Sequence, residues 1–406
     1  MWSSLFLATL RSSALLLKFC LYLYLASFAG VEMLGWLGLL TACTIMYSAI
    51  GDGCVLQTIA RDSVTTSFKT TLNELRLYLR CIPYFFICIL IIGMGLVVYG
   101  VNWLLIFLSV ALVFSELLNN NFFILLMNQQ RPYDAQLLYV VRSGLWIPVF
   151  IGITFYNPDF LTLEFLLGIW SCVSACVAAF LILKLKLFGT IKRGDISTFA
   201  WLLTKIKKST SLLKLNFLMA LNDCAASFIL SLTLGVEKLG IYTYFQQVAS
   251  AMMNIIRFGI IQPLWPSLIK LYQEANIRPL EIQKKHLLVV MVLSLLGSFV
   301  AYPAYYYLGQ WLGHGDFQPY FSLFIPILLL FVVSSFGCLQ DAVFYSVKKE
   351  GILNVILMIV LPINILMIFL MGQFSGLYGV VWGTVLIAGA VVVYKQVRLI
   401  KIPALI

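Results

Sequence analysis

The sequence predicts an all-α polytopic membrane protein with about twelve transmembrane helices in two pseudo-symmetric six-helix bundles. Its composition is the first reason: 62% of the 406 residues are hydrophobic, 11% are charged, and the mean hydropathy is +0.99. Such a chain has too little polar surface to cover itself in water. Apolar runs of about 20 residues, enough to cross about 30 Å of hydrocarbon, are the second reason. The third is a repeat, because GVEMLG (30–35) returns as GVEKLG (235–240), 205 positions later.

The apolar runs follow one another along nearly the whole chain. In order, the expected spans are 13–29, 34–60, 79–99, 103–127, 136–155, 163–183, 211–234, 239–261, 286–307, 320–347, 352–371 and 377–394. Each repeat copy lies in a hairpin between an odd and an even span, so the two halves are expected to run parallel. We therefore expect an N-terminal bundle over 1–183 and a C-terminal bundle over 211–406. A basic linker over 184–210 joins them.

The basic residues indicate how the chain is oriented. The Lys and Arg residues fall almost entirely on the side of the membrane that holds the N-terminus, and the opposite side carries only Lys238. Because basic loops are retained in the cytoplasm, both termini are expected there. The net charge of +11 is thus a topology signal, and no basic soluble domain indicates a nucleic-acid partner. The segment 196–210 mixes apolar and basic residues, which is typical of an amphipathic helix on the inner membrane surface.

Cysteine and histidine give no sign of a cofactor or metal. The nine cysteines lie in or beside apolar runs, where free Cys behaves as a small hydrophobe, and their spacing fits no disulfide framework. His286 and His314 are far from any matching ligand pattern. We expect neither a cofactor nor a metal site, and no catalytic residues.

Charged residues inside the expected spans are the candidates for function, because each costs roughly 2.5 to 3.5 kcal/mol to insert. Six stand out: Lys18, Asp52, Glu116, Arg142, Asp223 and Arg257. The 205-residue offset maps the first onto Asp223 and the second onto Arg257, so the repeat keeps the positions and exchanges the signs. Each half is expected to form one pair across its helices, Lys18 with Asp52 and Asp223 with Arg257. The alternative is that these are purely structural pairs, although such pairs are poor sources of net stability.

Helical spacing favours a wet cavity. Thr243, Gln247, Ser250, Asn254 and Arg257 follow at steps of three and four, which places them on one face of the eighth span. Lipid would leave these groups without hydrogen-bond partners, whereas a water-filled cleft between bundles would not. Arg142 adds a cation with Tyr139 and Trp146 on its face. Tyr22, one turn after Lys18, is a candidate to stack on a sugar, the alternative being a packing or interface aromatic.

At this point the chain resembles a known superfamily. The segments GVEMLGWLGLL (30–40), GDGCVLQTIARD (51–62), GVEKLGIYTYFQQ (235–247) and GLYGVVWGTVLI (376–387) look like those of the multidrug, oligosaccharidyl-lipid and polysaccharide (MOP) exporters. Length and cationic interior look most like the Wzx-type polysaccharide (O-antigen) flippases. The resemblance covers most of the chain, but its motifs consist of glycine and apolar spacing.

The resemblance implies a V-shaped pair of six-helix bundles in a bacterial inner membrane. It further implies a flippase that moves an undecaprenyl-diphosphate-linked oligosaccharide, an O-antigen or other surface polysaccharide unit, from the cytoplasmic to the periplasmic leaflet by alternating access. Lys18, Arg142 and Arg257 match the family's basic diphosphate-binding residues in character and location, with Gln247, Asn254 and Tyr22 as further substrate-binding candidates. Asp52, Asp223 and Glu116 would serve as charge-pair or ion-coupling residues. Polysaccharide polymerase and chain-length machinery, together with membrane lipids, are the implied partners in lipopolysaccharide biosynthesis.

Two alternatives remain open at this stage. A cation-coupled multidrug antiporter of the same superfamily would use an acidic ion site in the first bundle. Asp52 and Glu116 keep that function open, while Lys18 in the first span opposes it. An integral-membrane polysaccharide polymerase or glycosyltransferase would need a sizeable loop for catalysis, and the longest outer loop, 308–319, carries one Asp and one His. We therefore expect that the protein is not an enzyme.

Overall fold

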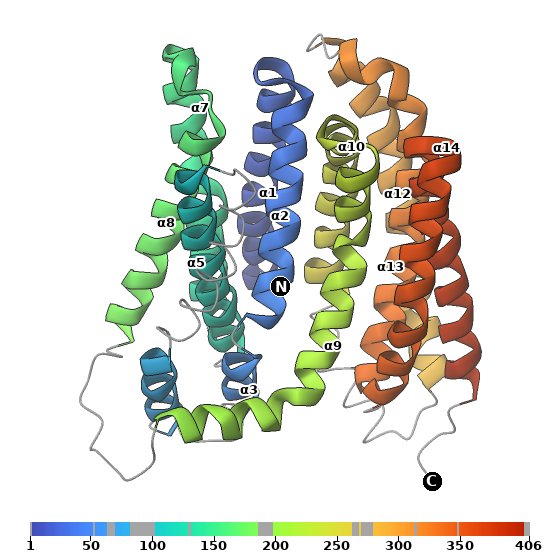
Figure 1. The fold of residues 1–406 in the computed structure, drawn as a ribbon. Helices are drawn as coiled ribbons and strands as arrows, with labels where there is room; N and C mark the ends of the chain where they lie inside the picture. Colours follow the sequence, from blue (N-terminus) through green and yellow to red (C-terminus); the bar gives the residue numbers. More distant parts are fainter. Residues whose placement is uncertain are drawn as a thin grey trace. The chain divides into compact units, whose positions relative to one another are not determined.

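The computed structural model describes residues 2–51, 53–62, 70–81, 102–128, 131–185, 198–261, 268, 279–311, 315–346 and 349–401. Within these ranges the regular structure is helical (Figure 1). Nine described stretches are long and apolar enough to cross a bilayer, which confirms the expected all-α, multi-pass membrane protein. The last of them, Gly351–Ile400, covers the final two predicted spans. Most of the predicted third span, 79–99, lies outside the described residues.

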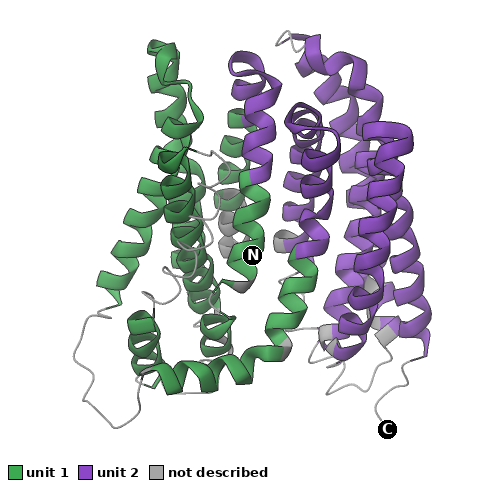
Figure 2. Cartoon of the chain, viewed as in Figure 1, with its two compact units in different colours: residues 1–21, 40–220 green, residues 22–39, 221–406 purple. Residues whose placement is uncertain are grey.

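The chain divides into two compact units, which Figure 2 distinguishes by colour. Unit 1 comprises Met1–Leu21 and Leu40–Ala220, and unit 2 comprises Tyr22–Leu39 and Leu221–Ile406. The first repeat, 30–35, therefore belongs to the same unit as the second, 235–240. The hairpin at the end of the first two helices packs with the second half of the chain.

The described part of unit 1 consists of several complete helices and parts of three others. The parts are the first part of α1 (Trp2–Phe28), the second part of α2 (Gly30–Ile50) and the first part of α9 (Thr198–Thr233). The complete elements are α3 (Val55–Asp62), a helix over residues 70–81, α5 (Trp103–Asn128), α6 (Pro132–Val140), the π-helix η1 (Val141–Leu145), α7 (Trp146–Tyr156), the 3₁₀ turn η2 (Pro158–Phe160) and α8 (Leu163–Lys184).

Local signals in the sequence explain several of these helix boundaries. Pro132 stands at the first turn of α6, where its missing N–H costs nothing. The Thr162 hydroxyl caps α8 by accepting from the Phe165 amide at 3.3 Å.

The linker segment forms the first part of α9 and packs on unit 1. Trp201 and Leu202 are buried in a core with residues of α3, α5, α6 and α8. Lys205 and Lys208 on the same helix pair with Glu74 at 2.5 Å and Asp62 at 2.8 Å. An amphipathic helix of this kind presents one face to an apolar surface and the other to polar partners. The first part of α9 runs across one end of unit 1 (Figure 1). Its apolar side chains belong to the buried core there.

Unit 2 contains the ends of α1 and α2 that meet in their hairpin, the rest of α9 and the C-terminal helices. These are α10 (Val236–Ile255), the π-helix η3 (Ile256–Ile261), α12 (Pro279–Trp311), η4 (Gly315–Leu323), α13 (Phe324–Ser346) and α14 (Glu350–Ile400). A non-helical Gly376, with φ of +60°, separates the two parts of α14. Glycine adopts this left-handed backbone without steric cost, so Gly376 ends one span and begins the next.

The two repeats contact each other inside unit 2. A Cβ added to Gly35 would lie 2.0 Å from the carbonyl oxygen of Val236, and one added to Gly240 would lie 2.0 Å from that of Val31. These two contacts are related by the same 205-residue offset as the repeat. Glycine is required because only its missing side chain lets α2 and α10 approach this closely. We refer to Val31, Gly35, Val236 and Gly240 as the glycine seam.

Candidate functional site

Three basic side chains of unit 1 surround the ring of Tyr139. The guanidinium carbon of Arg11 lies 4.3 Å from the ring centroid, that of Arg142 lies 5.7 Å from it, and Nζ of Lys18 lies 6.0 Å from it. All three are within the range in which an aromatic ring attracts a cation. Arg11 and Lys18 are seven residues apart on α1, so they share a helix face. Tyr139 and Arg142 are three apart across the junction of α6 and η1. We call these four residues the cationic cluster.

Glu116 of α5 supplies the acidic partner of Arg142. Its Oε2 lies 3.5 Å from Nη1 of Arg142, and its Oε1 accepts hydrogen bonds from Trp170 Nε1 at 3.2 Å and Ser174 Oγ at 3.0 Å. Arg142 also donates from Nη2 to the side-chain oxygen of Asn120 at 2.5 Å. Glu116 is 6% exposed and Arg142 is 4% exposed. A buried ion pair is stable only when further hydrogen bonds satisfy its atoms, and Trp170, Ser174 and Asn120 provide them.

A π-helix places Arg142 at the centre of the unit. Residues Val141–Leu145 form one widened turn between α6 and α7, a type of irregularity that is frequent at functional sites. Gly144 within this turn lets η1 approach α1 closely. A Cβ added there would lie 3.1 Å from Cδ1 of Leu17 and 3.4 Å from Cα of Ala14. The widened turn and the glycine bring Arg142 to the helix that carries Arg11 and Lys18.

The site gathers basic side chains and contains donors without a hydrogen-bond partner. Among the described residues, three cations and the carboxylate of Glu116 lie at or beside the Tyr139 ring. Within the described residues, Nε of Arg142 and the indole Nε1 of the buried Trp146 have no hydrogen-bond partner. Trp146 stacks on Trp170 with ring centroids 5.5 Å apart. Charged donors in a poorly hydrated site are suited to hold an anion such as a phosphate.

The structure brings some of the predicted site residues together and leaves others in unit 2. Lys18, Arg142 and Glu116 are in or beside the cationic cluster. The other predicted site residues that the structure describes belong to unit 2. Asp223 lies on α9 and Arg257 on η3, Gln247 and Asn254 are half-buried on α10, and Tyr22 is buried on α1. Asp52 lies outside the described residues, as does its expected pairing with Lys18.

Asp223 and Arg257, which were expected to pair, lie in unit 2 near two further charged side chains. The charges of Arg257, Asp341 and Lys395 all act on the Asp223 carboxylate. Asp341 of α13 in turn binds Nζ of Lys395 on α14 at 2.6 Å. The sequence-based list of charged residues omitted both Asp341 and Lys395. Lys395 directly follows the last apolar run, 377–394, so a search for charges inside the spans does not include it.

Sequence reasoning also missed four members of the unit 1 site, namely Arg11, Asn120, Trp170 and Ser174. Arg11 was counted only as a topology signal. A usable sign was present, since Arg11 and Lys18 are seven residues apart and thus on one face of a helix. The other three are ordinary residues for a membrane helix, and only their contacts with Glu116 and Arg142 reveal their roles.

Comparison with solved structures places this geometry in a known fold. An inward-facing multidrug resistance MATE family transporter of the MOP superfamily superposes with a TM-score of 0.70 at 17% identity, covering 97% of this chain and 98% of the other. The chain has the MATE transporter fold. A MATE protein in complex with MaD3S matches this chain with a TM-score of 0.60 at 16% identity, over 98% of this chain and 95% of that one.

The same fold is shared with a lipid flippase. The lipid II flippase MurJ in an inward closed conformation gives a TM-score of 0.69 at 13% identity, covering 98% of this chain and 88% of MurJ. No protein-family model and no curated protein matches the sequence. Since the same fold occurs in multidrug transporters and in a lipid flippase, the side chains of the site have to distinguish between these functions.

Proposed function

We propose that the protein is a flippase of the MOP type, which moves an undecaprenyl-diphosphate-linked oligosaccharide from the cytoplasmic to the periplasmic leaflet by alternating access. The cationic cluster is the observation that carries this proposal. A diphosphate cannot cross hydrocarbon without compensating charge, and Arg11, Lys18 and Arg142 bring three cationic side chains to one aromatic ring of unit 1. Arg142 has the planar donors that fit phosphate oxygens in pairs.

In this proposal Lys18 and Arg142 bind the diphosphate, and Arg257 with Gln247 and Asn254 forms a second polar contact area in unit 2. Tyr22 packs within its unit rather than stacking on a sugar, because it is only 6% exposed. The protein would reside in a bacterial inner membrane with both termini in the cytoplasm. It would hand its substrate to polysaccharide polymerase and chain-length machinery.

A cation-coupled multidrug antiporter is the second candidate, because the fold of MATE transporters favours it. The cationic cluster opposes it, since three cations in one unit repel a positively charged drug. An enzyme is a weaker candidate. The acidic side chain of this site, Glu116, is held by three groups and is almost fully buried, so it is poorly placed for acid–base chemistry on a substrate.

Conditional depletion separates these functions. After depletion we expect a lipid-linked oligosaccharide to accumulate on the cytoplasmic leaflet while sensitivity to cationic dyes stays unchanged. The reverse result, dye accumulation with normal lipid-linked sugars, would support the antiporter. Hydrolysis or transfer of the labelled lipid-linked sugar by purified protein would support an enzyme and contradict the flippase.

A further inference from the structure

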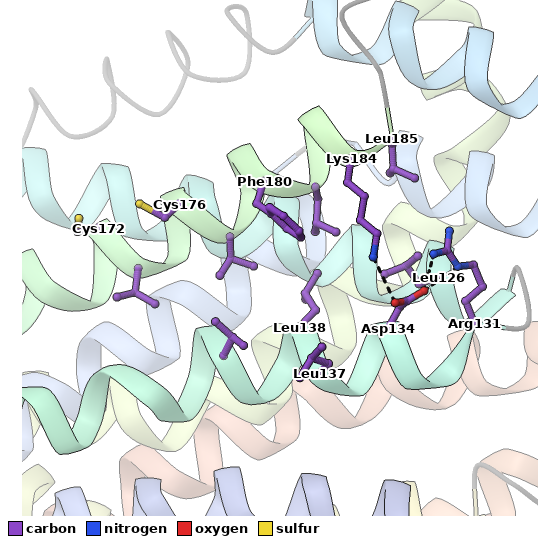
Figure 3. A pocket seen from close by; sticks show the side chains of 14 residues that line it. Leu126, Arg131, Asp134, Leu137, Leu138, Cys172, Cys176, Phe180, Lys184 and Leu185 are labelled. Atoms are coloured by element: carbon purple, nitrogen blue, oxygen red, sulfur yellow. Dashed lines mark hydrogen bonds and ion pairs between the residues drawn. The ribbon is translucent and has the colours of Figure 1, made fainter. Parts of the chain in front are cut away.

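A second concave site lies on unit 1 between α6 and α8. Its volume is about 370 Å³, which is within the range of ligand sites. Figure 3 shows that its two ends differ in character. The walls are apolar side chains such as Leu137, Leu138 and Phe180, whereas Arg131, Asp134 and Lys184 gather at one end. We call this site the α6–α8 groove.

The groove is separate from the cationic cluster. Asp134, Leu137, Leu138 and Val141 line it from α6 and the start of η1, at spacings of three and four residues that define one helix face. Tyr139 and Arg142 lie about a quarter to a third of a turn away on the same helix. The groove and the cluster therefore occupy different faces of α6, and a ligand in one does not fill the other.

The apolar part of the groove has the size and exposure of a lipid-facing surface. Leu137 is 55% exposed and Phe180 is 60% exposed, although both lie in spans that cross the bilayer. The groove follows α8 from Cys172 to Leu185, about 20 Å along the helix axis. One leaflet of hydrocarbon is about 15 Å thick, half the bilayer core. A hydrocarbon chain that follows this groove would therefore reach from the polar end through the whole of its leaflet.

The polar end carries a net charge of +1. The Asp134 carboxylate binds Nη2 of Arg131 at 2.5 Å and Nζ of Lys184 at 3.3 Å. The two basic side chains remain 41% and 45% exposed. Asp134 uses two of the five N–H donors of the guanidinium and one of the three of the ammonium, so both cations can bind a further anion. Basic pockets between membrane helices at the cytoplasmic side bind anionic lipid head groups in this way.

We propose that the α6–α8 groove binds an anionic glycerophospholipid of the surrounding bilayer. One acyl chain lies along Leu137, Leu138 and Phe180, and the phosphate contacts Arg131 and Lys184. Trp201 and Leu202 of the linker helix belong to the same buried core as Ala135 of α6 and Leu181 of α8. A lipid bound here therefore supports the part of unit 1 on which the linker rests. This proposal does not depend on the transported substrate.

Photo-crosslinking of the full-length protein in lipid nanodiscs tests it. Phosphatidylglycerol with a diazirine in one acyl chain should label groove residues of α6 and α8, and phosphatidylcholine with the same chain should label them less. In the double variant Arg131→Gln with Lys184→Gln, the ratio of labelling by phosphatidylglycerol to labelling by phosphatidylcholine should fall about fivefold for each cation removed. Lys208→Gln is the matched control, because Lys208 also belongs to a partly exposed ion pair with a carboxylate on the same unit but lies outside the groove. The Lys208→Gln variant should be labelled by both lipids to the same extent as the wild type.

The native cysteines give a second measurement that needs no variant. Cys172 and Cys176 are exposed along the groove, and Cys43 is exposed outside it. Phosphatidylglycerol should slow maleimide alkylation of Cys172 and Cys176 severalfold relative to Cys43 in the same sample. Equal labelling and equal alkylation with both lipids would overturn the proposal. Protection by polyprenyl diphosphate but not by phosphatidylglycerol would also overturn it, because the groove would then hold the transported lipid.

Discussion

The carboxylate of Glu116 is kept in the interior of unit 1 by donors of three kinds. An indole N–H, a hydroxyl and a guanidinium all approach it, and the guanidinium is itself held by Asn120. Removing one charge of such a pair leaves the other buried without compensation, whereas removing both does not. Stability and anion binding therefore respond differently to single and double substitutions at this pair.

We expect Glu116→Gln and Arg142→Gln each to lower stability by about 3 to 5 kcal/mol, because each strands a buried charge. The double variant should recover membrane abundance and thermal stability. It should remain unable to support transport, because the planar cation is gone. Arg142→Lys, which keeps the charge but not the paired donors, is the intermediate control.

Immunoblots of membrane fractions, thermal unfolding in detergent and complementation of a flippase-deficient strain measure the three properties. Normal transport by the double variant would show that Arg142 has only a structural role. Loss of abundance in the double variant would show that the pair is needed for folding.

At the scale of elements, the glycine seam makes a prediction about helix packing. Alanine at Gly35 or Gly240 places a Cβ about 2.0 Å from a backbone oxygen, so α2 and α10 have to move apart. We expect each substitution to destabilise unit 2 by about 1 to 3 kcal/mol, and by similar amounts because the contacts correspond. Thermal unfolding of the purified protein measures this. Gly389→Ala in α14 is the control, since no atom lies within 4 Å of an added Cβ there.

Alanine favours a helix by about 1 kcal/mol over glycine, so propensity alone would make all three variants more stable. A rise in the unfolding temperature of Gly35→Ala to that of Gly389→Ala would mean that α2 and α10 do not depend on the close contact. Unequal effects of Gly35→Ala and Gly240→Ala would mean that the two halves of the seam differ in their ability to relax.

The sequence predicted the elements better than their irregularities. Apolar length identifies spans such as α5 and α8 directly, because hydrocarbon thickness sets the length of a helix that crosses it. The eighth predicted span is present as α10 and η3, yet it is not among the nine apolar stretches, since its polar residues lower its hydropathy. The π-turn at Arg142 had no signal at all, because a widened turn depends on packing against α1 rather than on local residue preference.

The sequence likewise predicted some residues of the candidate site and missed others. Lys18, Glu116 and Arg142 were found because a charge in a membrane span is costly and therefore conspicuous. Their partners Asn120, Trp170 and Ser174 were not found, because helix rotation and crossing decide which neutral side chains meet a charge. The spacing of polar residues in the sequence shows which side chains share one face of a helix. It does not show which other helix that face contacts.

For the whole molecule, the distribution of basic residues predicts which loops reach the outside. Single cysteines at Asp316 and Ser375 in a cysteine-free background should react with an impermeant maleimide added to intact cells. Both positions are exposed, in η4 and at the bend of α14. A cysteine at the exposed Lys207 of the linker helix should react only after the cells are permeabilised. Labelling of Lys207→Cys in intact cells would reverse the orientation, and with it the proposed direction of transport.

The glycine seam also bears on how a chain of this kind is built. The glycine seam is an isologous contact, in which two equivalent patches pack against each other: Val31 against Gly240, and Val236 against Gly35. Such a contact is the usual interface of a homodimer with two-fold symmetry. A half-length polypeptide with Val and Gly at these positions would thus carry a self-complementary hairpin, and two copies could form the seam as separate chains. Joining the copies into one polypeptide leaves this contact intact and frees each half to change elsewhere, as the opposite charges of Lys18 and Asp223 illustrate.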